Sequence, residues 1–295
     1  MSLVDDDPRG GNSSNSSNST APSLEMPLTI AAAIFWCVGA TVGTSIFILL
    51  TRMYRNGLDT DLVNAVACQA AVYLVVILLV VRRHEGDRQL SSVFAFRRTH
   101  PGFYFLGFIL GVCLQVPAEL LQRLANRIVP IAPEALQMQI DMLRMDTAVS
   151  RLMIPFVAVV LGPFVEELLF RGVLFGGMRR CYGAVRTMVV VSLLFAGAHG
   201  SVQGLIPLLL VGGVVTFLRF ASGSIIPCLV AHGVFNAVAV FAMAVGWLRL
   251  EGEAQPLPNY LSVGGVVASA LIVGAIVALS RNSEIAELAR QEDLA

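Results

Sequence analysis

The sequence predicts an all-α protein, a polytopic transmembrane bundle of about eight helices with both termini in the cytoplasm. Of its 295 residues, 56% are hydrophobic and only 14% are charged, and the mean hydropathy is +0.75. An average soluble domain has roughly 25% charged residues, and a soluble fold of this length could not bury so much apolar surface. The expected solvent is therefore the lipid bilayer, and the chain is expected to be an integral membrane protein.

The first 26 residues are expected to form a disordered tail. They contain an acidic run followed by an Asn/Ser tract, Asn12 to Thr20, with too few apolar residues to pack. The Asn-x-Ser/Thr triplets in this tract would be glycosylation acceptors in a lumenal tail, but any Asn/Ser repeat creates them by default. The next apolar stretch starts too late, and lacks the basic lead-in, for a cleavable signal peptide.

Eight apolar segments follow, and each is expected to be a helix because about 20 apolar residues span a bilayer. The third has polar residues near its middle, and the fifth and sixth are short. The segments are 27–51, 61–81, 103–126, 149–178, 184–200, 204–221, 225–248 and 259–280. They define a transmembrane bundle over 27–280 and leave 281–295 as a cytoplasmic tail.

Arginine placement predicts the orientation, because cytoplasmic loops collect positive charge. Twelve arginines fall on one side of the alternating segments and seven on the other, and five of the twelve crowd the loop between 82 and 98. This side is assigned to the cytoplasm. His84 and His100 lie in the same loop and are expected to be solvated.

Charge and cysteine usage exclude two further classes of protein. The net charge of +0 and the pI of about 6.9 provide no basic field for nucleic acid, so no nucleic-acid partner is expected. The five cysteines are scattered and include no CxxC pair, which argues against a zinc ribbon or a disulfide framework.

An amphipathic helix is expected between the third and fourth segments. Ala135, Met138, Met142 and Met145 repeat there at helical spacing, with polar residues elsewhere around the wheel. Two interpretations stand: a packing helix that covers the bundle, or a lid or substrate guide with adaptable Met side chains.

The stretch from Gly162 to Gly172 contains three ionisable groups within an apolar helix. Each charge in mid-bilayer costs about 2.5 to 3.5 kcal/mol, so the three need compensation. Glu167 and Arg171 are four residues apart, which predicts an ion pair on one helix face. Glu166 points about 100° away from Glu167 and has no local partner, so it is the free carboxylate.

Two histidines fall inside predicted spans. His199 shares a helix face with Phe195, and His232 shares one with Asn236. Buried polar groups must find one another or remain unsatisfied at a cost of several kcal/mol. Glu166, His199, His232 and Asn236 are therefore expected to converge on one cavity.

These four side chains suit amide hydrolysis. A desolvated glutamate is a stronger base than one in water, and a neighbouring histidine can help it to hold and deprotonate a water molecule. A second histidine and an asparagine offer N–H donors for the oxyanion that forms when a carbonyl is attacked. Ser192 and Ser201 flank His199 without the pattern of a covalent nucleophile, so water is the expected nucleophile.

At these residues the sequence resembles the CAAX prenyl protease and bacteriocin-processing (CPBP, abortive-infection type) family of intramembrane proteases. The motifs Glu166-Glu167-x-x-x-Arg171, Phe195-x-x-x-His199 and His232-x-x-x-Asn236 occur in the family's order, and the resemblance places a protease core at about 125–245. It implies that Glu166 and His199 activate water and that His232 and Asn236 stabilise the oxyanion. It also implies that Glu167 and Arg171, with Phe195, hold the geometry of the site.

Members of this family have been described both as metalloproteases and as metal-independent glutamate proteases. Glu166, His199 and His232 could bind Zn²⁺ with a water in the fourth position. That set would leave Glu167, already expected to pair with Arg171, as the only base. The metal-free mechanism is therefore preferred, and no cofactor is expected, with zinc as the alternative.

Two other functions stand beside the protease. Intramembrane Glu and His also build the proton relays of transporters, but the two halves of this chain show no similarity of the kind that inverted repeats produce. A non-catalytic membrane scaffold is the second alternative. The expected substrate is a membrane-embedded or lipidated protein, prenylated or with a CAAX-like C-terminus, and the expected location is a bacterial cytoplasmic membrane.

Overall fold

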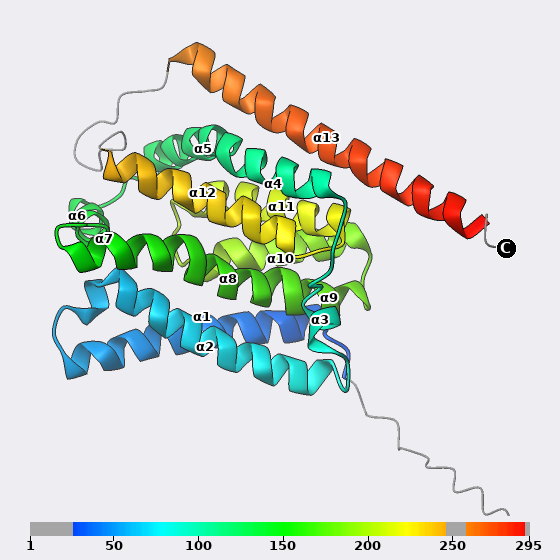
Figure 1. Cartoon of the computed structure of the whole chain (residues 1–295). Helices are drawn as coiled ribbons and strands as arrows, with labels where there is room; N and C mark the ends of the chain where they lie inside the picture. The colour runs from blue at the N-terminus through cyan, green and yellow to red at the C-terminus, as the bar shows by residue number, and fades with distance from the viewer. Residues whose placement is uncertain (1–25, 246–257, 293–295) are drawn as a thin grey trace, which may run out of the picture.

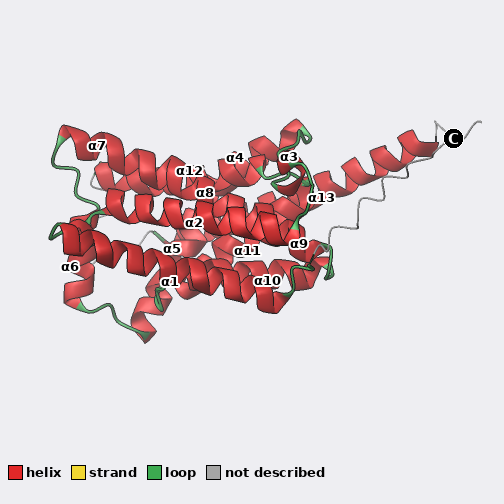
Figure 2. Ribbon diagram, turned by 90° about the horizontal axis from the view of Figure 1, so that it is seen from below, coloured by secondary structure: helices red, strands yellow, loops and turns green. Residues whose placement is uncertain are grey.

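The structure, a computed structural model, describes residues 26–245 and 258–292, and these residues form helices and connecting loops without a strand (Figures 1 and 2). Its α-helices in chain order are α1 (Ile30–Tyr54), α2 (Leu62–His84), α3 (Leu90–Val93), α4 (Pro101–Cys113), α5 (Gln115–Ile128), α6 (Pro133–Met142), α7 (Ala148–Pro155), α8 (Gly162–Glu167), α9 (Phe175–Arg179), α10 (Ala184–Ala198), α11 (Leu205–Ser222), α12 (Ile226–Ala244) and α13 (Asn259–Glu292). A 3₁₀ turn, η1 (Leu58–Thr60), precedes α2, and two π-helical segments, η2 (Phe156–Leu161) and η3 (Leu168–Leu174), flank α8.

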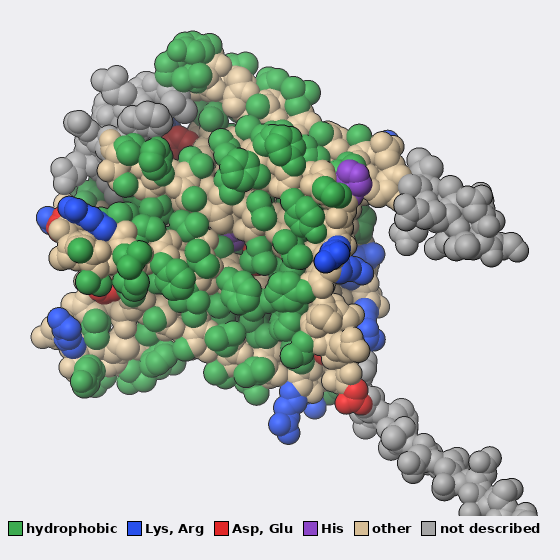
Figure 3. All heavy atoms as spheres, viewed as in Figure 1, with side chains coloured by type: hydrophobic (Ala, Val, Ile, Leu, Met, Phe, Trp, Pro, Cys, Tyr) green, Lys and Arg blue, Asp and Glu red, His purple; other side chains and the backbone are tan. Residues whose placement is uncertain are grey.

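Seven helical stretches within the described residues are long and apolar enough to cross a membrane. They confirm the predicted polytopic helical bundle, and Figure 3 shows apolar side chains over its middle with arginines gathered toward both ends. The predicted segment at 184–200 is the exception in length, because α10 has 15 residues. At 1.5 Å per residue it is about 22 Å long, shorter than the roughly 30 Å hydrocarbon core.

The stretch from α7 to α9 runs through the centre of the bundle (Figure 1). Residues Leu168 to Phe175 are all buried, and α2, α10 and α12 contact this stretch from different sides. Phe170 and Phe195 meet edge to face at 5.3 Å within the core, a favoured aromatic arrangement. Closely packed apolar side chains therefore surround the two acidic residues of α8.

A shifted hydrogen bond and a proline mark the irregular course of this central helix. The N–H of Gly162 bonds to the carbonyl of Val157, five residues back, instead of that of Ala158. The next residue, Pro163, has no N–H to offer, so Ala158 loses both possible backbone donors. Such π-helical segments are often found at functional sites.

The loop between α2 and α4 differs from the expectation in one respect. His84 is the last residue of α2 and is buried, with Nδ1 2.8 Å from the Met26 carbonyl oxygen and Nε2 accepting the indole N–H of Trp36 at 3.0 Å. The expectation of a solvated His84 was therefore wrong, because Trp36 of α1 and the backbone at Met26 cover the ring. His100 is exposed and caps the start of α4.

The predicted amphipathic helix corresponds to α6. It has no buried residue, and Met138 is half exposed. Among the described elements it contacts η1 at the end of the bundle opposite the arginine-rich loop (Figure 2).

Candidate active site

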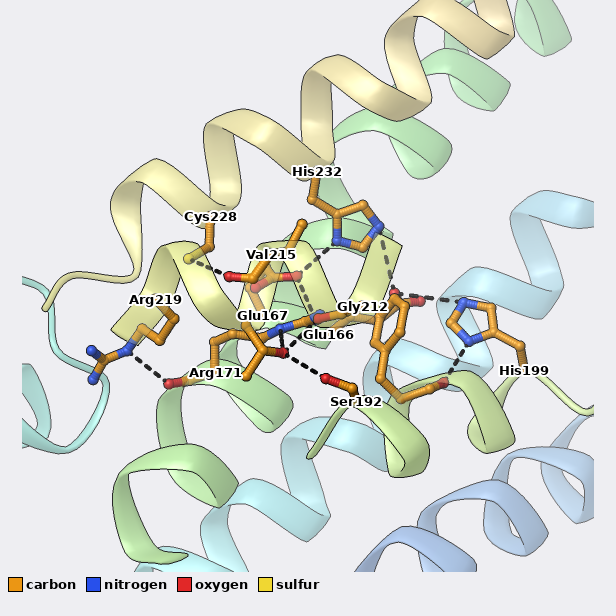
Figure 4. Close-up of polar contacts among 12 residues, drawn as sticks. Glu166, Glu167, Arg171, Ser192, His199, Gly212, Val215, Arg219, Cys228 and His232 are labelled. Carbon is orange, nitrogen blue, oxygen red and sulfur yellow. Dashed lines mark hydrogen bonds and ion pairs between the residues drawn. The ribbon is translucent and has the colours of Figure 1, made fainter. Parts of the chain in front are cut away.

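The polar residues of the predicted site come from three neighbouring helices (Figure 4). Glu166 and Glu167 end α8, His199 caps the C-terminus of α10, and His232 lies in the second turn of α12. Glu166 and His232 are nearly buried, at 8% and 6% exposure, while Glu167 is completely buried. The structure brings these four side chains together inside the bundle.

Glu167 and Arg171 form the expected ion pair, with Oε1 and Nη1 2.8 Å apart and neither side chain exposed. The other nitrogens of Arg171 are also occupied: Nη2 donates to the Gly212 carbonyl at 3.0 Å and Nε to Thr216 Oγ1 at 3.3 Å. The buried charge is therefore paired and hydrogen-bonded, which is the condition for burying it at acceptable cost. The pair locks α11 against the central helix.

Glu167 also orients His232. The Oε1 atom of Glu167 lies 2.8 Å from His232 Nδ1, so the carboxylate accepts a hydrogen bond from Nδ1–H. The other ring nitrogen, Nε2, then faces Glu166, 3.8 Å from its Oε2. Sequence reasoning gave Glu167 one partner, Arg171, whereas the structure gives it two.

His199 is held by the backbone of its own helix. Its Nδ1 lies 2.8 Å from the Phe195 carbonyl oxygen, and since a carbonyl can only accept, Nδ1 carries a proton. In the neutral ring Nε2 is then an acceptor, and it lies 3.9 Å from Glu166 Oε2. Gly200 ends α10 directly after His199 in the left-handed conformation, at φ +63°, so the histidine stands at a helix terminus with its side chain 30% exposed.

The ring of Phe195 is the packing centre of the site. It lies 4.8 Å from the ring of His199, 5.8 Å from that of His232 and 4.3 Å from the Arg171 guanidinium carbon. Gly212 makes room for it, since a Cβ there would be 2.7 Å from Phe195 Cδ1. This supporting role was predicted for Phe195.

Gln69 is a site residue that sequence reasoning missed. It comes from α2 and donates from Nε2 to Glu166 Oε1 at 3.0 Å. Glu166 therefore has one oxygen held by Gln69, while its other oxygen faces the two histidines. The available signal was an amide seven residues into an apolar span, because polar residues within membrane spans often mark functional positions.

Asn236 makes a contact that was not expected. Its Nδ2 donates to the carbonyl of Ala158 at 2.7 Å, the same carbonyl that the π-helical register and Pro163 leave without a backbone donor. The asparagine thus satisfies a backbone group of the central helix. An amide has two N–H groups, so one is left for another partner.

Glu166, His199 and His232 are residue types that bind zinc, but the distances between their nearest atoms are wider than in a zinc site. Two imidazole nitrogens and a carboxylate oxygen are zinc ligands with bond lengths of about 2.0 to 2.2 Å, which in a tetrahedron puts neighbouring ligand atoms roughly 3.3 to 3.6 Å apart. The separations from Glu166 Oε2 are 3.8 and 3.9 Å. Within the described residues no group of three or more His, Cys, Asp or Glu side chains is arranged to hold a metal ion.

The hydroxyl and thiol groups near the site have other partners. Ser192 donates to the Met188 carbonyl at 2.7 Å, Ser201 accepts from the Gly204 N–H at 2.9 Å, and the Cys228 thiol faces the Val215 carbonyl at 3.5 Å. None of these contacts joins a nucleophile to a histidine, as covalent catalysis would require.

Comparison with known protein families gives a match over part of the chain. Residues 148–238 match the family model described as type II CAAX prenyl endopeptidase Rce1-like. The segment runs from the start of α7 into α12 and contains all three motifs, and the match supports the family that the motifs predicted. No curated protein and no solved structure matches the chain.

Proposed function

We propose, on the match of residues 148–238 to the Rce1-like family model, that the protein is an endopeptidase of membrane-associated proteins. It hydrolyses a peptide bond with water activated by Glu166 and His199, and its substrate is lipidated or membrane-embedded. The observation that carries the proposal is the convergence of His199 Nε2 and His232 Nε2 on Glu166 Oε2, at 3.9 and 3.8 Å.

Glu166 and His199 share the activation of water. A water molecule between Glu166 Oε2 and His199 Nε2 can donate both of its protons to these two acceptors, which leaves a lone pair for attack on a carbonyl carbon. Gln69 supports this step because its hydrogen bond fixes the carboxylate from the opposite side. The proton taken from water then passes to the amine nitrogen as the C–N bond breaks, as general acid–base catalysis requires.

His232 is the proposed oxyanion donor. With both ring nitrogens protonated it gives Nδ1–H to Glu167 and offers Nε2–H to the developing negative charge. The second N–H of Asn236 is proposed as a further donor, since its first is bound to Ala158.

The mechanism as proposed uses no metal, and zinc held by Glu166, His199 and His232 is the alternative. A zinc ion would supply a bound water of lowered proton affinity. The spacing favours the metal-free mechanism, because the three ligands would have to draw together by a few tenths of an ångström. We also propose a bacterial cytoplasmic membrane as the location, on the short loops, the absence of lysine and the low-complexity N-terminal tract of the sequence.

The test is cleavage by the purified full-length protein in liposomes, with a panel of prenylated and unprenylated membrane peptides. Glu166→Gln should abolish cleavage while the thermal unfolding midpoint stays within a few degrees of wild type. Glu134→Gln, an exposed carboxylate on α6, is the matched control and should cleave normally. Full activity of Glu166→Gln would refute the proposal, and loss of activity on chelation with recovery on added Zn²⁺ would establish the zinc mechanism instead.

A further inference from the structure

A cavity of about 380 Å³ lies at the arginine-rich end of the bundle, away from the catalytic residues. It is formed where α2, α3, α9 and α11 end and the following loops begin. Its charged lining consists of five arginines and one glutamate: Arg88, Arg97, Arg179, Arg180, Arg219 and Glu85. We call it the arginine pocket.

The one carboxylate that lines the arginine pocket, Glu85, already pairs with an arginine. Glu85 is fully buried, and its Oε1 is 2.5 Å from Arg180 Nη2. It therefore holds one arginine in place and neutralises one charge. Arg97, Arg179 and Arg219 remain as lining arginines that no carboxylate of the described residues pairs with.

Arg219 is the most informative of the five, because it is only 6% exposed. Its Nε donates to the Arg171 carbonyl at 3.0 Å, and its guanidinium lies 5.1 Å from the ring centre of Phe175. Figure 4 shows its two terminal nitrogens directed away from Arg171, and no carboxylate in the described part of the chain pairs with them. A buried guanidinium without a counter-ion is costly, which indicates that an anion belongs beside it.

Two further arginines surround this position. Arg97 Nε donates to the Gly223 carbonyl and Arg179 Nη1 to the Tyr182 carbonyl, at 2.5 and 2.7 Å. Backbone carbonyls fix the direction of these side chains but do not neutralise their charge. Both keep unused guanidinium N–H groups at the cavity.

We propose that the arginine pocket binds a phosphate group, supplied by the headgroup of an anionic membrane lipid or by a soluble phosphate. The planar guanidinium matches phosphate oxygens in pairs of hydrogen bonds. Basic pockets between transmembrane helices on the cytoplasmic side are typical sites for anionic lipid headgroups. The cavity volume also falls within the usual range for a small-ligand site.

The experiment measures ligand-dependent unfolding of the full-length protein in neutral detergent. The probes are inorganic phosphate, short-chain phosphatidylglycerol and short-chain phosphatidylcholine, with chloride added to equal ionic strength. A ligand that binds the folded state raises the unfolding midpoint in proportion to its affinity. We expect phosphatidylglycerol or inorganic phosphate to bind at least tenfold more tightly than phosphatidylcholine.

The variants separate a built site from general surface charge. Arg97→Gln with Arg179→Gln should weaken binding at least tenfold. Arg98→Gln with Arg186→Gln removes the same charge from two exposed arginines that do not line the pocket, and should change binding less than twofold. Should the first pair fail to fold, Ser92→Asp places a carboxylate in the pocket and should abolish binding, with Ser91→Asp as its control.

The arms also identify the source of the phosphate. A response to phosphatidylglycerol alone assigns the pocket to a lipid headgroup, and a response to inorganic phosphate that the lipid cannot displace assigns it to a soluble anion. Equal binding of all three probes, or equal losses in pocket and control variants, would overturn the proposal. None of these readouts needs proteolysis, so the outcome is independent of the proposed enzyme activity.

Discussion

Replacing Glu167 with glutamine should destabilise the protein strongly even though it changes one atom. Oε1 of Glu167 accepts 2.8 Å hydrogen bonds from both Arg171 and His232. The amide oxygen of glutamine can still accept, but without charge, so Arg171 becomes a completely buried cation without a counter-ion. Removing one partner of a buried pair costs about 3 to 5 kcal/mol.

The structure places this variant near the lower end of that range. Arg171 keeps its hydrogen bonds to the Gly212 carbonyl and Thr216 Oγ1, so only the loss of charge compensation counts. At about 3 kcal/mol, and roughly 2 to 4 °C per kcal/mol for a protein of this size class, the unfolding midpoint should fall by roughly 6 to 12 °C. The measurement is thermal unfolding in detergent, followed by a thiol-reactive or scattering probe.

A double variant gives this prediction its control. Glu167→Gln combined with Arg171→Met removes both charges and keeps an apolar chain of similar length in the core, so it should recover much of the lost stability. A midpoint shift below about 2 °C for Glu167→Gln, or a double variant less stable than either single one, would refute the reasoning about compensated charge.

Three further predictions concern single contacts. Gln69→Ala should lower the rate of cleavage at least tenfold with little change in the unfolding midpoint, measured against Gln122→Ala, which changes an amide of α5 bonded outside the site. Asn236→Ala leaves the Ala158 carbonyl without a donor and should cost about 1 to 3 kcal/mol of stability; an unchanged unfolding midpoint would show that the asparagine acts only on the substrate. Gly212→Ala would push a methyl group to 2.7 Å from Phe195, so both stability and activity should fall, while Gly213→Ala has room for its methyl group and should be silent.

The local part of the site could be predicted from the sequence. The pairing of Glu167 with Arg171 follows from helical spacing alone, and the meeting of Glu166 with two histidines follows from the cost of isolated polar groups in lipid. The positions of the helices could also be predicted, since long apolar runs are the strongest sequence signal in a membrane protein.

Contacts that depend on helix register and rotation could not be predicted in the same way. The partner of Asn236 exists because Pro163 and a five-residue hydrogen bond free one carbonyl, and no spacing rule encodes that. Gln69 lies about 100 residues from the motif that it serves, and only the rotation of α2 decides whether its amide faces Glu166 or lipid. The burial of His84 depends on Trp36, 48 residues away in the sequence, and on the backbone at Met26.

The short length of α10 bears on how water could reach a hydrolytic site in the hydrocarbon core of a membrane. Hydrolysis of a peptide bond consumes one water molecule, and the hydrocarbon core holds almost none. Because α10 stops roughly 8 Å short of the usual hydrocarbon thickness, the chain that follows it must satisfy its backbone polar groups at membrane depth, which is tolerated only against protein or a wet hollow. His199 lies at this end of α10 with its side chain 30% exposed, so the histidine proposed to activate water lies next to backbone that itself needs polar partners at membrane depth.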